Sequence, residues 1–206
     1  SEVDQYQAWK ALNRDANLPK DKRSLPADLV ADRDQLTQGT LNGKPRKAVY
    51  EQALREENEL NKSVLNVAKE LGLIDQQGYD KFASDIYYIP FYKQMEDGDV
   101  QSVSNASKLT GQQFSKALKG GEKQLNDLME NVLLNWSHIL SAAMKNQAAV
   151  KTIDAAAKMG AAQEVKPMDG KYPKGSVKVM RDGKAVHYEL TDPDLVDAIS
   201  TISYLG

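Results

Sequence analysis

The sequence predicts a mainly α-helical protein with a small β-hairpin near its C-terminal end. Apolar residues recur at helical spacing between Pro45 and Leu71, and again over a longer stretch between residues 122 and 159. The period then changes to alternation in "SVKVMRDGKAVHYEL", residues 176–190. We therefore predict a helical hairpin, one long helix, and a C-terminal β-hairpin packed on a helix.

Composition places the chain among globular proteins and excludes several classes of site. The 206 residues are enough for a sizeable core, with 41% hydrophobic and 27% charged residues. The net charge of −2 gives no chain-wide basic field of the kind that non-specific nucleic-acid binding needs. The absence of cysteine excludes disulfides, thiolate metal sites and cysteine nucleophiles. No apolar run approaches the roughly 18–20 residues that cross a bilayer, so we expect no membrane partner.

Residues 1–43 form the least organised part of the chain, an irregular and partly helical N-terminal extension. Its first helix, in "VDQYQAWKALNRD", would bury Tyr6, Trp9 and Leu12, and a second short helix is expected in "LPADLVADRDQL". "TLNGKP" breaks that helix. The basic residues Lys20, Lys22 and Arg23 are interleaved with acids, which favours a solvated loop over a phosphate site.

The predicted helical hairpin begins after Pro45. Its first helix ends at Gly72, a residue suited to the left-handed position after a helix, and Asp75 is the expected N-cap of the second, which would run towards Ile89. A DNA-reading second helix would expose basic and amide residues, whereas this one carries aromatic and aliphatic ones. The expected apolar stripe of the first helix is Val49, Ala53, Leu60, Val64, Ala68 and Leu71.

Tyrosine and phenylalanine side chains gather around Pro90 in "DIYYIPFYKQMEDGD", residues 85–99. Proline ends a helix, so these aromatics lie at a connection. We interpret them as anchors of that connection on the core, with a partner or ligand surface as the alternative. A nucleic-acid stacking platform is disfavoured because only Lys93 lies near. Small and polar residues then predict a linker over 98–121.

The long helix of residues 122–159 carries a heptad-like seam about five repeats long. Leu128, Leu133, Leu140 and Met144 widen it, which indicates burial against several helices. Asn146 on the seam sets helix register or oligomer state, or else pairs inside the domain. The seam is Leu125, Met129, Val132, Trp136, Ile139, Ala143, Asn146, Val150, Ile153 and Ala157.

The closing segment is a hairpin followed by a helix. Asp182-Gly183 is a strong two-residue turn signal that pairs Val179 with Val186 and sets Lys178 opposite His187. The expected helix starts at the Asp192 cap and covers the hairpin with Leu195, Ile199 and Ile202. Because a lone hairpin is marginal in water, it needs this helix or a third strand. We place domain boundaries to give 1–43, 44–165 (helical) and 166–206 (hairpin and helix).

No catalytic constellation stands out in the sequence. Two isolated histidines, His138 and His187, do not make a metal site, and no serine-nucleophile elbow occurs. We therefore expect no catalytic residue, no cofactor and no metal. The candidate interaction surface consists of Tyr88, Phe91, Tyr92, Trp136 and Asn146.

Three stretches together resemble a domain found in large polyvalent proteins of phages and prophages. They are "YYIPFYKQMEDGD", "FSKALKGGEKQLNDLMENVLLNWSHILSAAMKNQAAV" and "VKVMRDGKAVHYELTDPDLVDAI", in the same order as in that domain and covering roughly residues 45–206. Lys93 stands where the family commonly has arginine. Relatives usually continue past the end of this sequence, so we expect it to be a piece of a longer phage protein.

The resemblance implies a setting rather than an activity. Such domains lie beside enzymatic modules in long proteins that are thought to enter the recipient cell with the genome, which implies the virion or the bacterial host cytoplasm. We expect a non-enzymatic structural or interaction module that contacts neighbouring modules or a second copy. The alternative is a nucleic-acid-associated module that acts on the injected DNA.

Overall fold

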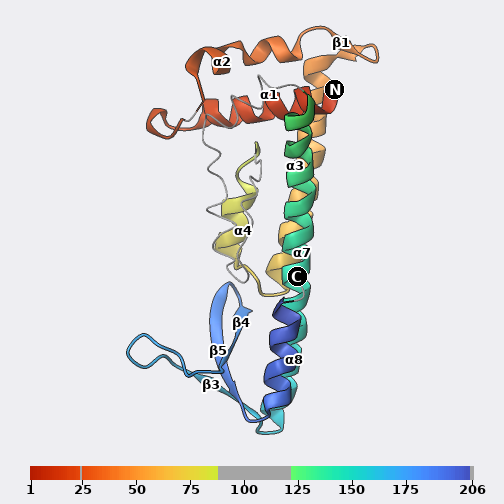
Figure 1. Ribbon diagram of the computed structural model, residues 1–206. Helices are drawn as coiled ribbons and strands as arrows, with labels where there is room; N and C mark the ends of the chain where they lie inside the picture. Colours follow the sequence, from red (N-terminus) through yellow and green to blue (C-terminus); the bar gives the residue numbers. More distant parts are fainter. Residues whose placement is uncertain (24, 88–121, 205–206) are drawn as a thin grey trace. The chain divides into compact units, whose positions relative to one another are not determined.

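The computed structural model describes residues 1–23, 25–87 and 122–204 (Figure 1). The fold is mainly α-helical with a small antiparallel sheet near the C-terminal end, as predicted. Two compact units are each built from two separate stretches, 1–61 with 85–136 and 62–84 with 137–206. Our boundaries at 43 and 165 stay predictions, because compactness alone does not show which segments fold independently.

The first unit is organised around α1 (Glu2–Asn17), the helix that the sequence predicts there. Ser1 and Asp4 form a capping box at its start, with each side chain satisfying a main-chain group of the other. Trp9 and Leu12 are buried at 4% and 2% exposure, in agreement with the burial that the sequence predicts for this helix. Leu12 packs with Val30, and Trp9 packs with Tyr50 and Leu54.

The rest of the N-terminal segment is short helices and a tight turn. The predicted second helix is split into α2 (Ala27–Ala31) and the 3₁₀ helix η2 (Asp32–Thr37), preceded by η1 (Lys20–Lys22). Arg23 donates to the carbonyl oxygens of Leu18 and Ala16 at 2.9 Å each, so one residue of the basic cluster caps the end of α1. β1 (Thr40–Leu41) and β2 (Lys44–Pro45) flank the Asn42-Gly43 turn.

Helix α3 (Arg46–Glu70) matches the predicted first arm of the helical hairpin, but its buried face differs from our stripe. Leu60 is 51% exposed, and Val49 and Ala53 are only half-buried. The larger side chains of Tyr50 and Leu54 take the buried side because they pack against Trp9. The buried residues of α3 are Tyr50, Leu54, Asn61, Val64, Leu65 and Ala68.

In the second unit, the end of α3 and the start of α4 (Gln76–Ala83) follow the predicted signals. Gly72 has φ +80°, and the Leu73 N–H donates to the Ala68 carbonyl at 2.9 Å, which closes the helix end. The Asp75 carboxylate accepts from the Gly78 N–H at 2.7 Å as N-cap. Helix α4 ends at Ala83 rather than near Ile89. The predicted helix is therefore too long, because Asp85 lies beyond the helix end and pairs with Arg14 of α1 at 3.2 Å.

Helix α7 (Glu122–Lys158) is the long helix that the sequence predicts. Side chains of its first ten residues lie outside the description. Beyond them the seam is narrower than expected, because Leu133 and Met144 are 53% and 64% exposed, and Ala157 is exposed. The buried residues of α7 are Val132, Asn135, Ile139, Ala143, Ala149, Ile153 and Ala156.

The C-terminal sheet has the predicted hairpin and one further strand. β4 (Val177–Arg181) and β5 (Lys184–Leu190) pair Val179 with Val186 and Lys178 with His187, in the predicted register. β3 (Ala162–Val165) adds to the other side of β5, giving the order β3-β5-β4. α8 (Pro193–Tyr204) covers one face, with Ile199 1% exposed against Ile153 of α7 and the valines of β4.

Gly183, in the turn between β4 and β5, lies close to the connection between α3 and α4. It has φ +75°, and a Cβ there would lie 2.8 Å from the Asp75 backbone nitrogen. We expect Gly183→Ala to lower the free energy of unfolding by about 2–4 kcal/mol, through backbone strain and overpacking. Urea denaturation would measure it, with Gly170→Ala as control, because that glycine has φ +72° and nothing within 4 Å. Equal losses in the two variants would contradict the close approach.

Candidate interaction sites

Asn146, a predicted interaction residue, uses its side chain inside the second unit. Its amide nitrogen donates to the carbonyls of Leu71 at 3.1 Å and Met180 at 2.8 Å, and its amide oxygen accepts from the Met180 N–H at 2.7 Å. These bonds join α7 to the end of α3 and to β4. Of the two roles that the sequence allowed, pairing inside the domain is the one the structure shows.

Trp136 is also held by a contact within the protein. Its indole N–H donates to the Asn61 side-chain oxygen at 2.9 Å, and Asn61 itself is 7% exposed. The remaining candidates, Tyr88, Phe91 and Tyr92, lie outside the described residues. Tyr87, just before them, is half-buried and meets Trp9 edge-on with ring centroids 6.2 Å apart. Interaction roles for the five candidates stay predictions.

A buried charge cluster in the first unit lies between α1 and α3. The Lys10 ammonium is 1% exposed and donates to Glu57 at 2.5 Å, while the Tyr6 hydroxyl donates to the other oxygen of the same carboxylate at 2.5 Å. Burial lowers the pKa of Lys10, and the adjacent Glu57 opposes that effect. Removing one member of a buried ion pair leaves an uncompensated charge in the interior, so the packing of α1 on α3 requires Lys10 and Glu57 together.

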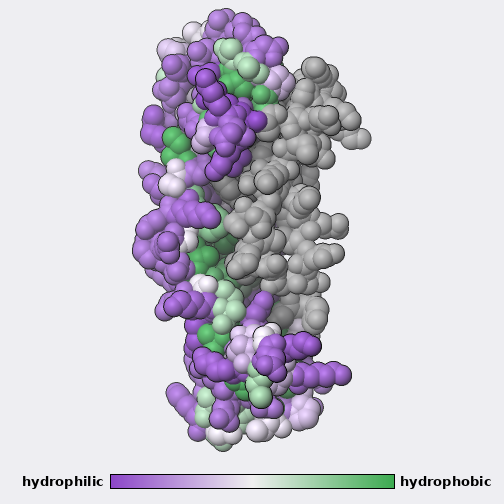
Figure 2. Space-filling model, turned by 90° about the vertical axis from the view of Figure 1, so that its left-hand side faces the viewer, coloured by the Kyte–Doolittle hydropathy of each residue, from purple (hydrophilic) through white to green (hydrophobic). Residues whose placement is uncertain are grey.

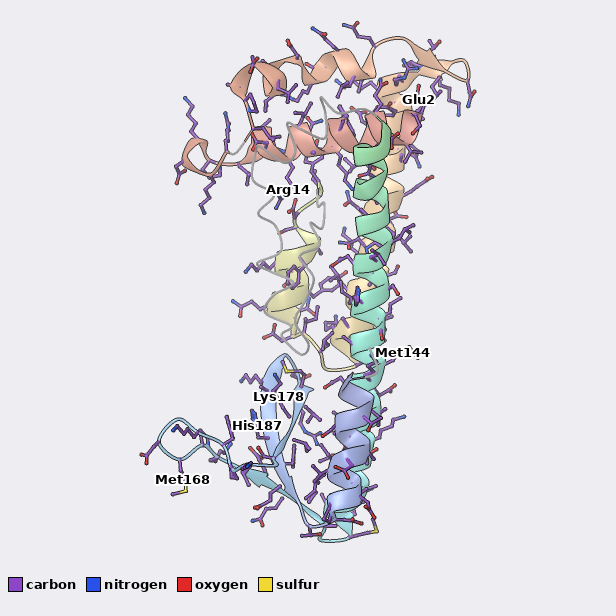
Figure 3. The ribbon with its side chains drawn as sticks, in the orientation of Figure 1. Glu2, Arg14, Met144, Met168, Lys178 and His187 are labelled. Atoms are coloured by element: carbon purple, nitrogen blue, oxygen red, sulfur yellow. The ribbon has the colours of Figure 1, made fainter. Side chains whose placement is uncertain are left out.

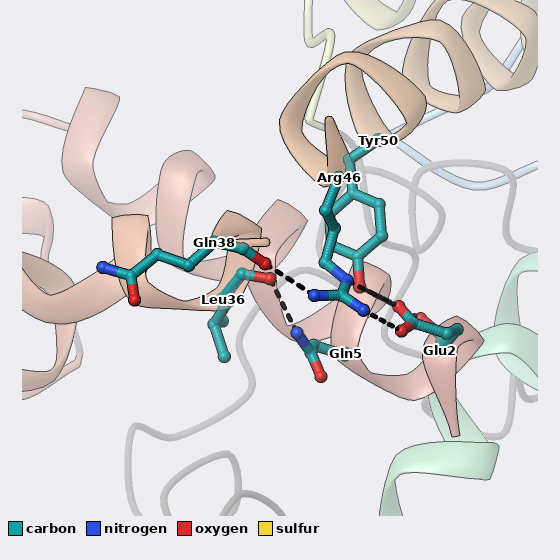
Figure 4. Close-up of polar contacts among 6 residues, drawn as sticks. All are labelled: Glu2, Gln5, Leu36, Gln38, Arg46 and Tyr50. Atoms are coloured by element: carbon teal, nitrogen blue, oxygen red, sulfur yellow. Dashed lines mark hydrogen bonds and ion pairs between the residues drawn. The ribbon is translucent and has the colours of Figure 1, made fainter. Parts of the chain in front are cut away.

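A second polar cluster fixes the start of α1 to α3 (Figure 4). Arg46 donates to Glu2 at 2.7 Å and to the Gln38 carbonyl at 2.5 Å, and the Tyr50 hydroxyl donates to Glu2 at 2.7 Å. These hydrogen bonds, first from Tyr50 and then from Arg46, lower the pKa of the Glu2 carboxyl. Both polar clusters therefore serve the packing of α1 on α3.

The exposed apolar residues of α7 are the feature best suited to binding a partner. Leu133 and Met144 are more than half exposed, and Leu140 is half-buried. Spacings of seven and four residues place the three side chains on one side of a helix with about 3.6 residues per turn. We call Leu133, Leu140 and Met144 the α7 outer face. Sequence reasoning identified these residues but assigned them to the core, because periodicity does not show what packs against a stripe.

Other classes of site have little support in the described part of the chain. Residues 1–23, 25–87 and 122–204 contain no cluster of three or more acidic or histidine side chains placed to hold a metal ion. None of the helices described combines the length and apolar character needed to cross a bilayer. Comparisons of the chain with protein-family models, with curated proteins and with solved structures find no match.

The Asn146 contacts lead to a prediction about stability. We expect Asn146→Ala to lower the free energy of unfolding by about 2–4 kcal/mol, because it removes three hydrogen bonds and leaves partly buried main-chain groups of Met180 in β4 without these partners. Chemical denaturation would measure the loss. The matched control is Asn66→Ala, which removes an amide bonded to Glu70 in an exposed contact and should change stability by at most about 0.5 kcal/mol. A similar small effect at both positions would contradict the assignment.

The buried tyrosines predict alkaline sensitivity of the first unit. Burial, with Glu57 for Tyr6 and Glu2 for Tyr50, raises the pKa of both phenols above the usual value of about 10. Their stabilisation is therefore complete below about pH 10 and is lost as the pH rises above it, since the unfolded chain releases these protons first. Of the nine tyrosines, Tyr6 and Tyr50 should ionise only when the chain unfolds. Ultraviolet absorbance would follow tyrosine ionisation, and circular dichroism would follow the loss of helix. Ionisation of all nine with the helix signal intact would refute this.

Proposed function

We propose that this chain is a non-enzymatic interaction module of a large phage or prophage polyvalent protein, which docks on a neighbouring module or a second copy. The phage setting, in the virion or the host cytoplasm, rests on the resemblance of the three sequence stretches given above. The docking role rests on the exposed apolar side chains of the α7 outer face, and this is the observation that carries the proposal.

Energetic considerations support docking through this face. Burying a leucine or methionine side chain contributes about 1.5–3 kcal/mol, so leaving Leu133 and Met144 half exposed or more forgoes part of that stabilisation in the isolated chain. A partner helix laid along α7 would recover it, in the same way that amphipathic helices dock through residues at intervals of three, four and seven. A stable interface needs about 800 Å² on each side, so flanking residues would contribute as well.

Self-association through the α7 outer face is tested by molar mass. We expect the chain, 22.8 kDa as a monomer, to show a concentration-dependent higher mass by light scattering behind a sizing column. The double variant Leu133→Glu with Met144→Glu should remain monomeric, because charge disfavours burial of that face.

Met159→Glu is the matched control for this experiment. Met159 is 75% exposed and directly follows the last residue of α7, so it is not part of the α7 outer face. It should leave the mass unchanged. A monomer at all concentrations would remove the second copy from the proposal, and loss of association in the control would show that the α7 outer face is not the contact.

A further inference from the structure

The connection between β3 and β4 forms a projecting finger, residues 166–174 (Figure 1). Its tip is a tight turn in which the Met168 and Lys171 backbones exchange hydrogen bonds of 2.8 and 2.9 Å. Asp169 and Gly170 between them both have positive φ, +51° and +72°, as a two-residue hairpin turn requires. The finger is therefore shaped by its own backbone.

The finger concentrates positive charge in a chain whose net charge is −2. Asp169 is its only acidic residue, and the whole finger is exposed. Figure 2 views the side from which the finger projects, and purple, hydrophilic residues lie there beside paler and green ones at the lower end of the view. Lys166 pairs with Glu164 at 2.7 Å, and the Lys166 side chain is 83% exposed. Because such a surface ion pair is weak, another anion can replace Glu164 as the partner of Lys166. The lysines of the finger and the adjoining strand β4 are Lys166, Lys171, Lys174 and Lys178.

An aromatic platform lies at the base of the finger. The Tyr172 ring stacks on the His187 ring with centroids 3.5 Å apart and planes 12° apart. Tyr172 is still 40% exposed although His187 lies against one face of its ring. Lys178 is the cross-strand partner of His187, and Figure 3 shows these two labelled residues on the hairpin and Met168 at the tip of the finger. Stacking fixes the ring plane in advance, which lowers the entropic cost of placing a second flat group on it.

We infer that the finger and the Tyr172 platform form a binding surface for single-stranded nucleic acid. Lysines neutralise phosphates of the backbone, and an unpaired base stacks on the exposed part of Tyr172. Any base has a face suited to stacking, so the surface is expected to be sequence-tolerant. An anionic membrane is the weaker alternative, because the tip offers a single large apolar side chain, Met168, for insertion. This function is separate from docking through the α7 outer face.

The experiment is fluorescence anisotropy of a labelled oligothymidylate titrated with the intact chain at several salt concentrations. We expect binding that weakens with salt. Lys171→Glu with Lys174→Glu should lower the affinity at least tenfold and reduce the slope of log K against log salt by about 1.4, at about 0.7 per phosphate contact. Tyr172→Ala should lower the affinity for the oligonucleotide about tenfold but leave binding to heparin, a polyanion without bases, nearly unchanged.

The matched control carries the same charge change elsewhere. Lys20→Glu with Lys22→Glu alters two exposed lysines of η1 and should retain wild-type affinity. Circular dichroism would verify that each variant is folded. Three outcomes would overturn the inference: no binding by the wild type, equal loss in the finger and control variants, or binding to anionic phospholipid vesicles without binding to the oligonucleotide. Loss of nucleic-acid binding with unchanged molar mass would leave the docking proposal standing.

Discussion

The second unit depends on the side-chain amide of Asn146. This residue, in the middle of α7, donates to the Met180 carbonyl and accepts from the Met180 N–H in β4. It also donates to the carbonyl of Leu71, just past the end of α3. The amide thus acts as a short substitute for a neighbouring strand at the outer edge of β4, where unpaired main-chain groups would otherwise invite association. The Gly183 N–H completes the junction by donating to the Gly72 carbonyl at 3.1 Å. A three-stranded sheet this small is stabilised by such contacts and by the α7 and α8 side chains beneath it.

The first unit solves a different problem, since α1 is rich in polar residues and yet is largely buried. Lys10 is nearly inaccessible, and the Glu57 carboxylate that neutralises it also accepts from Tyr6. The Tyr6 ring also packs with Trp9 and Tyr50, and the three ring centroids are 5.5–6.1 Å apart. Buried ion pairs add little net stability compared with apolar residues, but they penalise alternative packings in which the charge loses its partner. We infer that the cluster selects one arrangement of α1 on α3.

The two surfaces that we connect with function differ in chemistry. The α7 outer face is apolar and belongs to a regular helix, which suits contact with another helix. The finger is polar and basic and places an aromatic ring in a fixed orientation, which suits a flexible polyanion that carries flat bases. The docking that we propose for the first surface and the nucleic-acid binding that we propose for the second are compatible, because the two surfaces share no residue. Neither surface requires a catalytic group.

Local signals in the sequence determined the elements whose causes are local. Gly72, Asp75 and the Asp182-Gly183 turn each act through a few neighbouring residues, so the end of α3, the start of α4 and the hairpin register followed from them. The length of α7 followed from its repeated apolar pattern. The aromatic segment around Pro90, which we interpreted as a core anchor, lies outside the described residues and stays a prediction.

Tertiary structure decided whatever depends on residues distant along the chain. β3 has four residues without a strong alternation, and it is a strand because β5 offers it an edge. Leu133 and Met144 share the apolar character of the buried seam, and only the packing of other segments left them exposed. The amide of Asn146 fits the seam pattern equally well between helices or within one domain, and the position of β4 settled its partners. Periodicity fixes which side chains share a face, but the free energy of burial depends on what that face meets.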